Sequence, residues 1–209
     1  MPLREIPGPA GRLEALLDEP SESIALRAAV VLAHPHPQHG GTMHTKVVYQ
    51  TAKALARIGC AVLRFNFRGA GTSDGVFDEG IGEAGDFRAG LDFMQQRYQD
   101  ARHWTAGFSF GSWIASSAGA ADPRVSTLIG IGMPINRYDF DAVRTSAKPK
   151  FFIHAERDEI CPVKEIQQFY AKCEEPKELV VIDAADHLFD GKTSEVGDAI
   201  EDLLGDWYA

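Results

Sequence analysis

Three residues of this sequence could together activate a hydroxyl group for attack on a carbonyl carbon. Ser109 lies within Gly107-Phe108-Ser109-Phe110-Gly111, which has the form G-x-S-x-G. Asp158 and His187 follow later in the chain, in that order. A serine hydroxyl is a weak nucleophile until an imidazole takes its proton, and a carboxylate fixes the tautomer of that imidazole. The residue types and their order therefore predict nucleophilic catalysis of acyl transfer.

The glycines of the G-x-S-x-G pattern are explained by a sharp turn from a strand into a helix. Such a turn strains the serine backbone, and a side chain two residues before or after the serine would collide with it. About one random chain in ten of this glycine and serine content would contain the pattern, so its context must decide. The context fits, because residues 103–108 are predicted as a strand and a helix of small residues is predicted from Gly111.

The elements that must position these residues alternate between strands and helices. Continuous apolar runs predict strands buried on both faces, and apolar residues at helical spacing predict the helices between them. Residues 3–18 suit two short strands joined by a turn at Pro7-Gly8-Pro9, but Leu13 to Leu17 would equally suit a helix. Residues 135–147 are polar and irregular. The other strands are expected at residues 28–33, 60–67, 103–108, 125–131, 150–154 and 178–182, with helices from about residue 45, around 87–98, from 111, around 163–173 and around 196–207.

This alternation predicts an α/β fold with a mostly parallel sheet of about seven or eight strands and helices on both faces. In such sheets, ligands bind beyond the carboxyl ends of the strands. We therefore expect the loops at those ends to share one rim. Five loops follow the carboxyl ends of predicted strands: His34–Gly41, Arg68–Gly75, and those carrying Ser109, Asp158 and His187.

Several short motifs of the sequence are together specific for one protein family, although no single motif is. They are His34-Pro35-His36-Pro37 with Gly40-Gly41, Phe67-Arg68-Gly69-Ala70-Gly71-Thr72-Ser73, Gly107-Phe108-Ser109-Phe110-Gly111, Asp158 with Pro162, and His187. With this set, the chain from about Ala28 onward resembles the α/β-hydrolase superfamily. It looks most like small bacterial serine hydrolases related to the dienelactone-hydrolase group. The resemblance implies an α/β-hydrolase fold with minimal or no cap domain, Ser109 as nucleophile, His187 as general base and Asp158 as its orienting acid.

An acyl-transfer reaction also needs an oxyanion hole, in which two backbone N–H groups lie about 3 Å from the developing negative charge. Phe110 follows the nucleophile and begins a helix, whose positive end favours an anion. The second donor is expected in the first shaped loop. Pro35 and Pro37 lack an N–H group, so the backbone of His36 is the expected donor.

The composition indicates a single domain over residues 1–209, long enough to bury a substantial core. A net charge of -9 argues against nucleic acid or an anionic membrane surface as partner. Cys60, Cys161 and Cys173 are an odd number without a C-x-x-C motif, which favours reduced thiols. Because we find no secretory signal pattern and no apolar run of transmembrane length, we expect a cytoplasmic protein. The oligomeric state is not predicted.

Other carboxylates compete with Asp158 for the role of orienting acid. Glu156 and Glu159 are its neighbours, while Asp183 and Asp186 flank the histidine. Asp158 is favoured because it follows the correct strand and has the spacing to the next proline that the resemblance requires.

Two further motifs suggest a metal or a nucleotide, and neither is favoured. The four histidines between residues 34 and 44 include a His-x-His pair, but the surrounding prolines restrict convergence and no separate later ligand pair is present. Gly69-Ala70-Gly71 follows a strand, yet no Lys-Ser/Thr follows it and no third glycine opens a helix. We expect no metal and no cofactor.

The sequence thus predicts a serine hydrolase that cleaves small carboxylic esters through an acyl-enzyme. Between Ile131 and Lys150 there is little room for a helical lid, so we expect an open mouth and a preference for short acyl groups. A thioesterase or a lactone hydrolase could use the same residues. A non-catalytic binding protein on this scaffold is disfavoured by the intact serine, aspartate and histidine.

Overall fold

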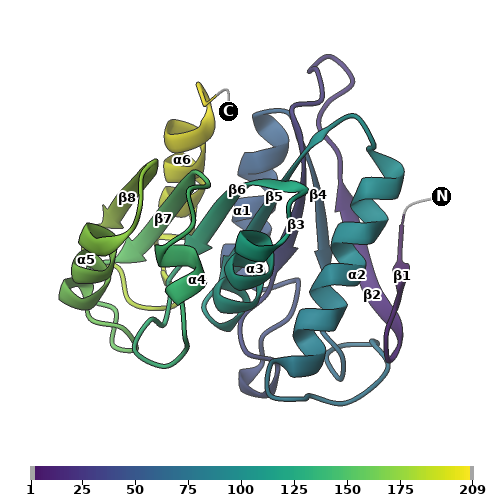
Figure 1. The fold of residues 1–209 in the computed structure, drawn as a ribbon, viewed down its shortest axis with the longest axis horizontal. Coiled ribbons are helices and arrows are strands. Elements are labelled where there is room, and N and C mark those ends of the chain that lie inside the picture. The colour runs from purple at the N-terminus through teal and green to yellow at the C-terminus, as the bar shows by residue number, and fades with distance from the viewer. Residues whose placement is uncertain (1–2, 208–209) are drawn as a thin grey trace.

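The computed structural model describes residues 3–207, and these form an eight-stranded sheet with helices on both faces (Figure 1). The strand order is β1-β2-β4-β3-β5-β6-β7-β8. The strands from β3 to β8 pair in parallel, which confirms the α/β fold class. The strands are β1 (Glu5–Gly8), β2 (Gly11–Asp18), β3 (Ala28–Ala33), β4 (Cys60–Phe65), β5 (Arg102–Phe108), β6 (Val125–Ile131), β7 (Lys150–Ala155) and β8 (Lys177–Ile182).

The first two strands form an antiparallel hairpin at the edge of the sheet, which decides between the two interpretations of residues 3–18. β2 pairs antiparallel with β4, and Ala15 lies opposite Phe65. Ile6, Leu13 and Ala15 are fully or almost fully buried. The alternation of buried and more exposed residues in β2 follows the period of a strand, and packing against the sheet outweighs the helical propensity of its leucines.

The helices cover the sheet in two layers. α1 and α6 contact each other on one face, while α2, α3, α4 and α5 lie on the other, as Figure 1 shows. Each layer closes an apolar core against the sheet, one containing Phe65 and Phe87 and the other containing Leu55 and Trp104. The helices are α1 (Lys46–Arg57), α2 (Ile81–Arg97), α3 (Phe110–Ala121), α4 (Asp141–Arg144), α5 (Val163–Lys172) and α6 (Thr193–Leu204).

Two short helical turns occur where the sequence predicted irregular structure. Pro37–His39 forms a 3-10 turn (η1) inside the first shaped loop, and the four-residue α4 lies between β6 and β7. Both are too short to produce a helical periodicity in the sequence. All three cysteines are free and buried. Within residues 3–207, no helix has both the length and the apolar character needed to cross a membrane.

Candidate active site

Ser109 lies at the turn between β5 and α3, with φ 53° and ψ −122°. A positive φ is uncommon and strained for a residue with a side chain. The flanking glycines make this turn possible. A β-carbon at Gly107 would overlap the carbonyl of Gly111, and a β-carbon at Gly111 would overlap the carbonyl oxygens of Ala33 and His34. The backbones of β3, β5 and α3 therefore approach one another too closely for any other residue at these positions.

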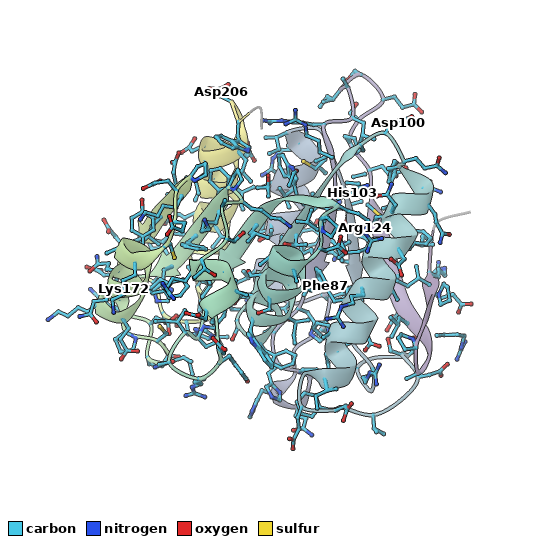
Figure 2. The ribbon with its side chains drawn as sticks, viewed as in Figure 1. Phe87, Asp100, His103, Arg124, Lys172 and Asp206 are labelled. Carbon is cyan, nitrogen blue, oxygen red and sulfur yellow. The ribbon has the colours of Figure 1, made fainter. Side chains whose placement is uncertain are left out.

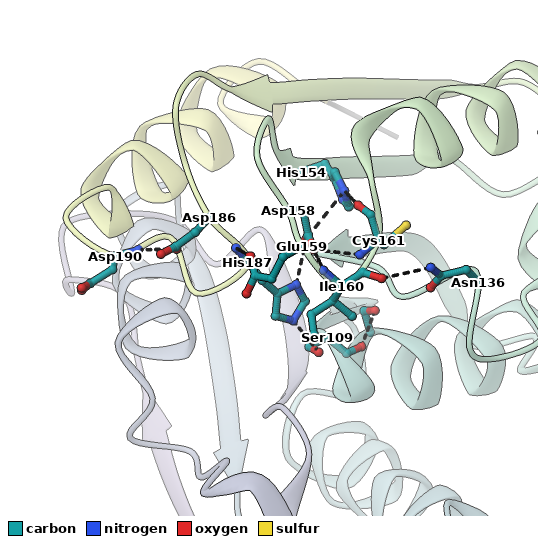
Figure 3. Close-up of polar contacts among 11 residues, drawn as sticks. Ser109, Asn136, His154, Asp158, Glu159, Ile160, Cys161, Asp186, His187 and Asp190 are labelled. Carbon is teal, nitrogen blue, oxygen red and sulfur yellow. Dashed lines mark hydrogen bonds and ion pairs between the residues drawn. The ribbon is translucent and has the colours of Figure 1, made fainter.

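The structure brings the three predicted site residues together at the carboxyl edge of the sheet (Figure 3). The Ser109 hydroxyl lies 2.9 Å from Nε2 of His187. Nδ1 of the same imidazole lies 2.8 Å from Oδ2 of Asp158. With the Nδ1–H tautomer, the ring donates to the carboxylate and its Nε2 lone pair accepts from the hydroxyl. This arrangement can remove a proton from Ser109 and stabilise the imidazolium that forms.

Asp158 lies in the loop after β7, with its side chain fully buried. Its Oδ1 accepts hydrogen bonds from the amides of Ile160 (2.8 Å) and Cys161 (2.9 Å), which leaves Oδ2 facing His187. Burial by itself raises the pKa of this carboxyl, but the hydrogen bonds from His187 and Cys161 outweigh it and hold the pKa below the usual range. The carboxylate is therefore ionised at neutral pH.

The neighbouring carboxylates hold backbone groups in place instead of the imidazole. Oε2 of Glu159 accepts from the amide of His187 at 3.1 Å, and Oε2 of Glu156 accepts from the amide of Ala184 at 2.7 Å. Asp186 is exposed and accepts from the amide of Asp190 at 3.0 Å. Of the competing acids weighed from the sequence, Asp158 alone is hydrogen-bonded to the His187 ring among the described residues.

The two amides predicted for an oxyanion hole belong to Phe110, which follows Ser109 in the chain, and to His36, which lines the same cavity as Ser109. Phe110 is the first residue of α3, and His36 precedes the turn Pro37–His39. Among residues 3–207, neither amide donates a hydrogen bond to another protein group. Rings of His36 and Phe110 are in contact, with centroids 4.9 Å apart, so the two segments are packed against each other. Both N–H groups are thus available to a ligand oxygen.

His34 anchors this loop to the sheet, a role that the sequence did not indicate. It is fully buried, its Nε2 accepts from the amide of Phe67 at 3.0 Å, and Nδ1 lies 2.6 Å from the carbonyl oxygen of Pro35. Burial lowers the pKa of His34 to about 4, so the ring is neutral and donates from Nδ1. Both ring nitrogens are occupied by the protein, which removes His34 from the metal ligands considered from the sequence.

A cavity of about 570 Å³ opens over Ser109 and His187. Its wall combines aromatic and aliphatic side chains with a few polar ones. Phe108 and Phe110, which belong to the two apolar cores, also line it. Leu188 at its edge is 61% exposed. The lining residues are Pro35, His36, His39, Gly40, Gly41, Thr45, Phe108, Ser109, Phe110, Pro134, Arg137, Tyr138, Glu159, Ile160, His187 and Leu188.

The segment between β6 and β7 leaves this cavity uncovered. It contains only the four-residue helix α4, which packs against α3 and α5. Tyr138 stacks on Trp113 of α3 with centroids 4.4 Å apart. The segment therefore packs against the helical layer and does not form a separate lid, as the sequence predicted.

The fold and the site define an α/β hydrolase of the serine type without a lid. The family model described as serine aminopeptidase, S33, matches residues 25–136, and the chain belongs to this family of hydrolases.

Similar proteins extend this likeness over almost the whole chain. The uncharacterized protein RP471 of Rickettsia prowazekii (strain Madrid E) is 37% identical over 216 residues, covering 98% of this chain and 89% of that protein. A serine hydrolase homologue of the α/β type from Coxiella burnetii has a TM-score of 0.90 at 36% identity, covering 96% of this chain and 95% of its own. XC6422 from Xanthomonas campestris, an α/β serine hydrolase without lid, has a TM-score of 0.89 at 34% identity, covering 97% and 92%. A specific relation to the dienelactone-hydrolase group stays a prediction.

Several supporting residues were not found from the sequence. The Glu159 carboxylate accepts from the backbone amide of His187, and the side-chain amide of Asn136 donates to the carbonyl of Ile160 at 3.0 Å. His154 donates to the carbonyl of Cys161, and all of these groups lie around the triad of side chains in Figure 3. No spacing signal could have revealed them, because each contact joins a side chain to a loop backbone whose path is set by the fold.

Proposed function

We propose that this protein hydrolyses carboxylic esters through an acyl-enzyme, with Ser109, His187 and Asp158 as its catalytic residues. The observation that supports this most directly is the continuous hydrogen-bonded chain from the Ser109 hydroxyl through the imidazole to a buried carboxylate. Ser109 and His187 line an open cavity together with His36 and Phe110, whose backbone amides have no protein partner among the described residues. Acyl transfer by an activated serine needs these parts.

The reaction would begin when His187 Nε2 takes the proton of Ser109 and Oγ attacks the ester carbonyl. The negative charge that develops on the carbonyl oxygen is stabilised by the amides of His36 and Phe110. His187 then gives its proton to the leaving alcohol. A water molecule attacks the acyl-enzyme with the same imidazole as base, and Ser109 is released with the carboxylic acid product. Every proton in this cycle is moved by groups of the chain itself.

The shape of the site favours substrates with short acyl groups. A cavity of about 570 Å³ with no lid offers little enclosed apolar surface to a long chain. Once the acyl chain is longer than a few carbons, each further carbon removes little additional apolar area from water and therefore adds little binding free energy. We expect p-nitrophenyl acetate and butyrate to be cleaved with higher kcat/KM than the palmitate ester. A clear optimum at palmitate would contradict this preference.

Amide hydrolysis is the second candidate, and it has an observation in its favour. The family is described as serine aminopeptidase, S33, and the Glu159 carboxylate lines the cavity. Glu159 forms no ion pair with a cation among residues 3–207, so it is available to a substrate ammonium group. Aminoacyl p-nitroanilides should be compared with the nitrophenyl esters. Thioester and lactone substrates belong in the same panel, because the same residues can cleave all of these acyl compounds.

Covalent labelling by a fluorophosphonate tests the nucleophile. We expect the parent protein to be labelled, and Ser109→Ala to lose both labelling and about 10⁶-fold in kcat. Ser116→Ala is the matched control, because this buried serine lies in α3 and its hydroxyl has no protein partner among the described residues. It should be labelled like the parent. A parent protein that takes no label would instead support a non-catalytic binding protein on this scaffold.

A further inference from the structure

His154 is a buried histidine that lies behind the acid of the site without touching the cavity. It belongs to β7 and is fully buried. Its Nε2 lies 2.7 Å from the carbonyl oxygen of Cys161, to which it donates. Figure 3 shows the ring on the far side of Asp158 from His187. The histidine thus connects the end of the strand to the end of the loop that carries the acid.

The contacts of Cys161 make this connection specific to Asp158. The Cys161 amide donates to Oδ1 of Asp158 at 2.9 Å, while the Cys161 carbonyl accepts from His154. Nε2 of His154 is also 3.6 Å from Oδ2 of Asp158, the oxygen that faces His187. The distance is too long for a hydrogen bond, but the N–H dipole lies close to the carboxylate. His154 therefore interacts with both carboxylate oxygens of Asp158, with Oδ1 through Cys161 and with Oδ2 directly through its N–H dipole.

Core packing does not account for an imidazole at this position. Nδ1 of His154 is buried and has no hydrogen-bond partner among the described residues. A buried polar atom without a partner lowers stability, and an apolar side chain of similar size would avoid that cost. Burial lowers the pKa of His154, so the ring is neutral and its single N–H must lie on Nε2 to serve the carbonyl. The ring thus presents one donor to the acid loop and an unsatisfied atom to the core.

We propose that His154 is a positioning residue, which fixes the loop of residues 158–161 so that Oδ2 of Asp158 stays aimed at His187. It acts through Cys161 and Asp158 and touches neither substrate nor the reacting atoms. The proposal rests on the proposed function, because an orienting acid matters only where His187 works as a base.

Substitutions that differ only in the reach of one donor test this role. His154→Gln places an amide N–H near the position of Nε2, whereas His154→Asn carries the same group one carbon shorter and cannot reach the Cys161 carbonyl. We expect His154→Asn and His154→Leu to lower kcat about tenfold with KM within about twofold, because only orientation in the reacting complex is lost. His154→Gln should recover most of the parent kcat. Having two variants without the donor keeps the comparison valid if one of them fails to fold.

Coupling to Asp158 separates positioning from a general loss of structure. In an Asp158→Asn background, His154→Asn should have little further effect on kcat, since the group through which it acts is already disabled. His103→Leu is the matched control. His103 is 4% exposed at the start of β5, close to Arg124 (Figure 2), and neither of its ring nitrogens has a partner among the described residues. His103→Leu should change the stability of the protein but leave kcat unchanged, both in the parent and in the Asp158→Asn background.

The outcomes separate this proposal from the proposed function. Equal kcat values for His154→Gln and His154→Asn, or a loss from His154→Asn that is undiminished in the Asp158→Asn background, would overturn the positioning role alone. A Ser109→Ala variant that cleaves esters as fast as the parent would overturn both proposals.

Discussion

The proposed nucleophile and the proposed acid–base pair are held in place by different physical means. Ser109 is positioned by excluded volume, since Gly107 and Gly111 lie too close to neighbouring backbone to carry a β-carbon. Asp158 and His187 lie on loops that are positioned by hydrogen bonds between side chains and backbone. In the first region the backbone is confined because other conformations would bring atoms into overlap. In the second region the loops are confined because a few polar groups form hydrogen bonds in the observed conformation.

The difference decides how each region responds to change. A turn confined by excluded volume tolerates no added atom, and its backbone is strained whenever the protein is folded. The steric overlap that confines it does not depend on pH. A loop held by polar contacts loses its geometry gradually as partners are removed, and each partner contributes about 0.5–1.5 kcal/mol. We therefore expect abrupt effects at the turn and graded ones in the loops, except where a reacting group itself is changed.

The largest effect in the loops is expected at Asp158. Asp158→Asn keeps the shape of the side chain but removes the charge that stabilises the imidazolium and the acceptor that fixes its tautomer. We expect kcat for p-nitrophenyl acetate to fall about 10⁴-fold, with KM changed much less. Asp186→Asn, at an exposed carboxylate next to the same histidine, is the control and should retain activity close to that of the parent. Comparable losses in the two variants would show that Asp158 is not the orienting acid.

The sequence predicted the excluded-volume region better than the polar one, for a physical reason. Close backbone approach requires glycine, so Gly107 and Gly111 mark the turn in the sequence itself. Ser109, Asp158 and His187 could be placed on one rim because parallel strands bring their carboxyl ends together. The polar groups that support Asp158 and His187 could not be placed in this way. Several carboxylates lie near these two residues in the sequence, and which backbone or ring each one contacts depends on the paths of the loops.

The same contrast applies to the fold. The strands from β3 to β8 were predicted almost to their observed ends, and most readily β3 and β4, whose residues are all buried and largely apolar. β2 remained ambiguous because it lies near the edge of the sheet and its leucines have helical propensity. The short helix α4 was missed, since its position depends on tertiary contacts with α3 and α5 more than on its own four residues.

Substitution of a glycine tests the excluded-volume region. We expect Gly107→Ala to lower the free energy of unfolding by about 3 kcal/mol, because the new methyl group would overlap the backbone of Gly111 and Ser112. Gly85→Ala in α2 is the matched control. A β-carbon there would make ordinary contacts with Pro9 and Arg68, so it should stabilise the helix by about 0.5–1 kcal/mol. Urea denaturation measures both changes, and a Gly107→Ala variant as stable as the parent would refute the steric account.

The pH dependence of stability sharpens the comparison further at His34, a polar support of the loop that carries His36. Its pKa is about 4 in the folded protein and about 6.5 in the unfolded chain, because burial disfavours the charged ring. Between these values the unfolded state binds the extra proton, so stability is fully present above pH 6.5 and is lost as the pH falls towards 4. The loss attributable to His34 is about 3 kcal/mol.

His34→Gln removes the titrating ring while its side-chain oxygen can still accept from the amide of Phe67. We expect the variant to be less stable than the parent at pH 7, since the hydrogen bond to Pro35 is lost, but to lose about 3 kcal/mol less on acidification to pH 4. Gly107→Ala should instead lower stability by the same amount at every pH, because a steric overlap binds no proton. Unfolding free energies measured by urea titration at pH 7, 5.5 and 4 distinguish the two patterns. Parallel curves for His34→Gln and the parent would mean that this ring does not couple protonation to folding.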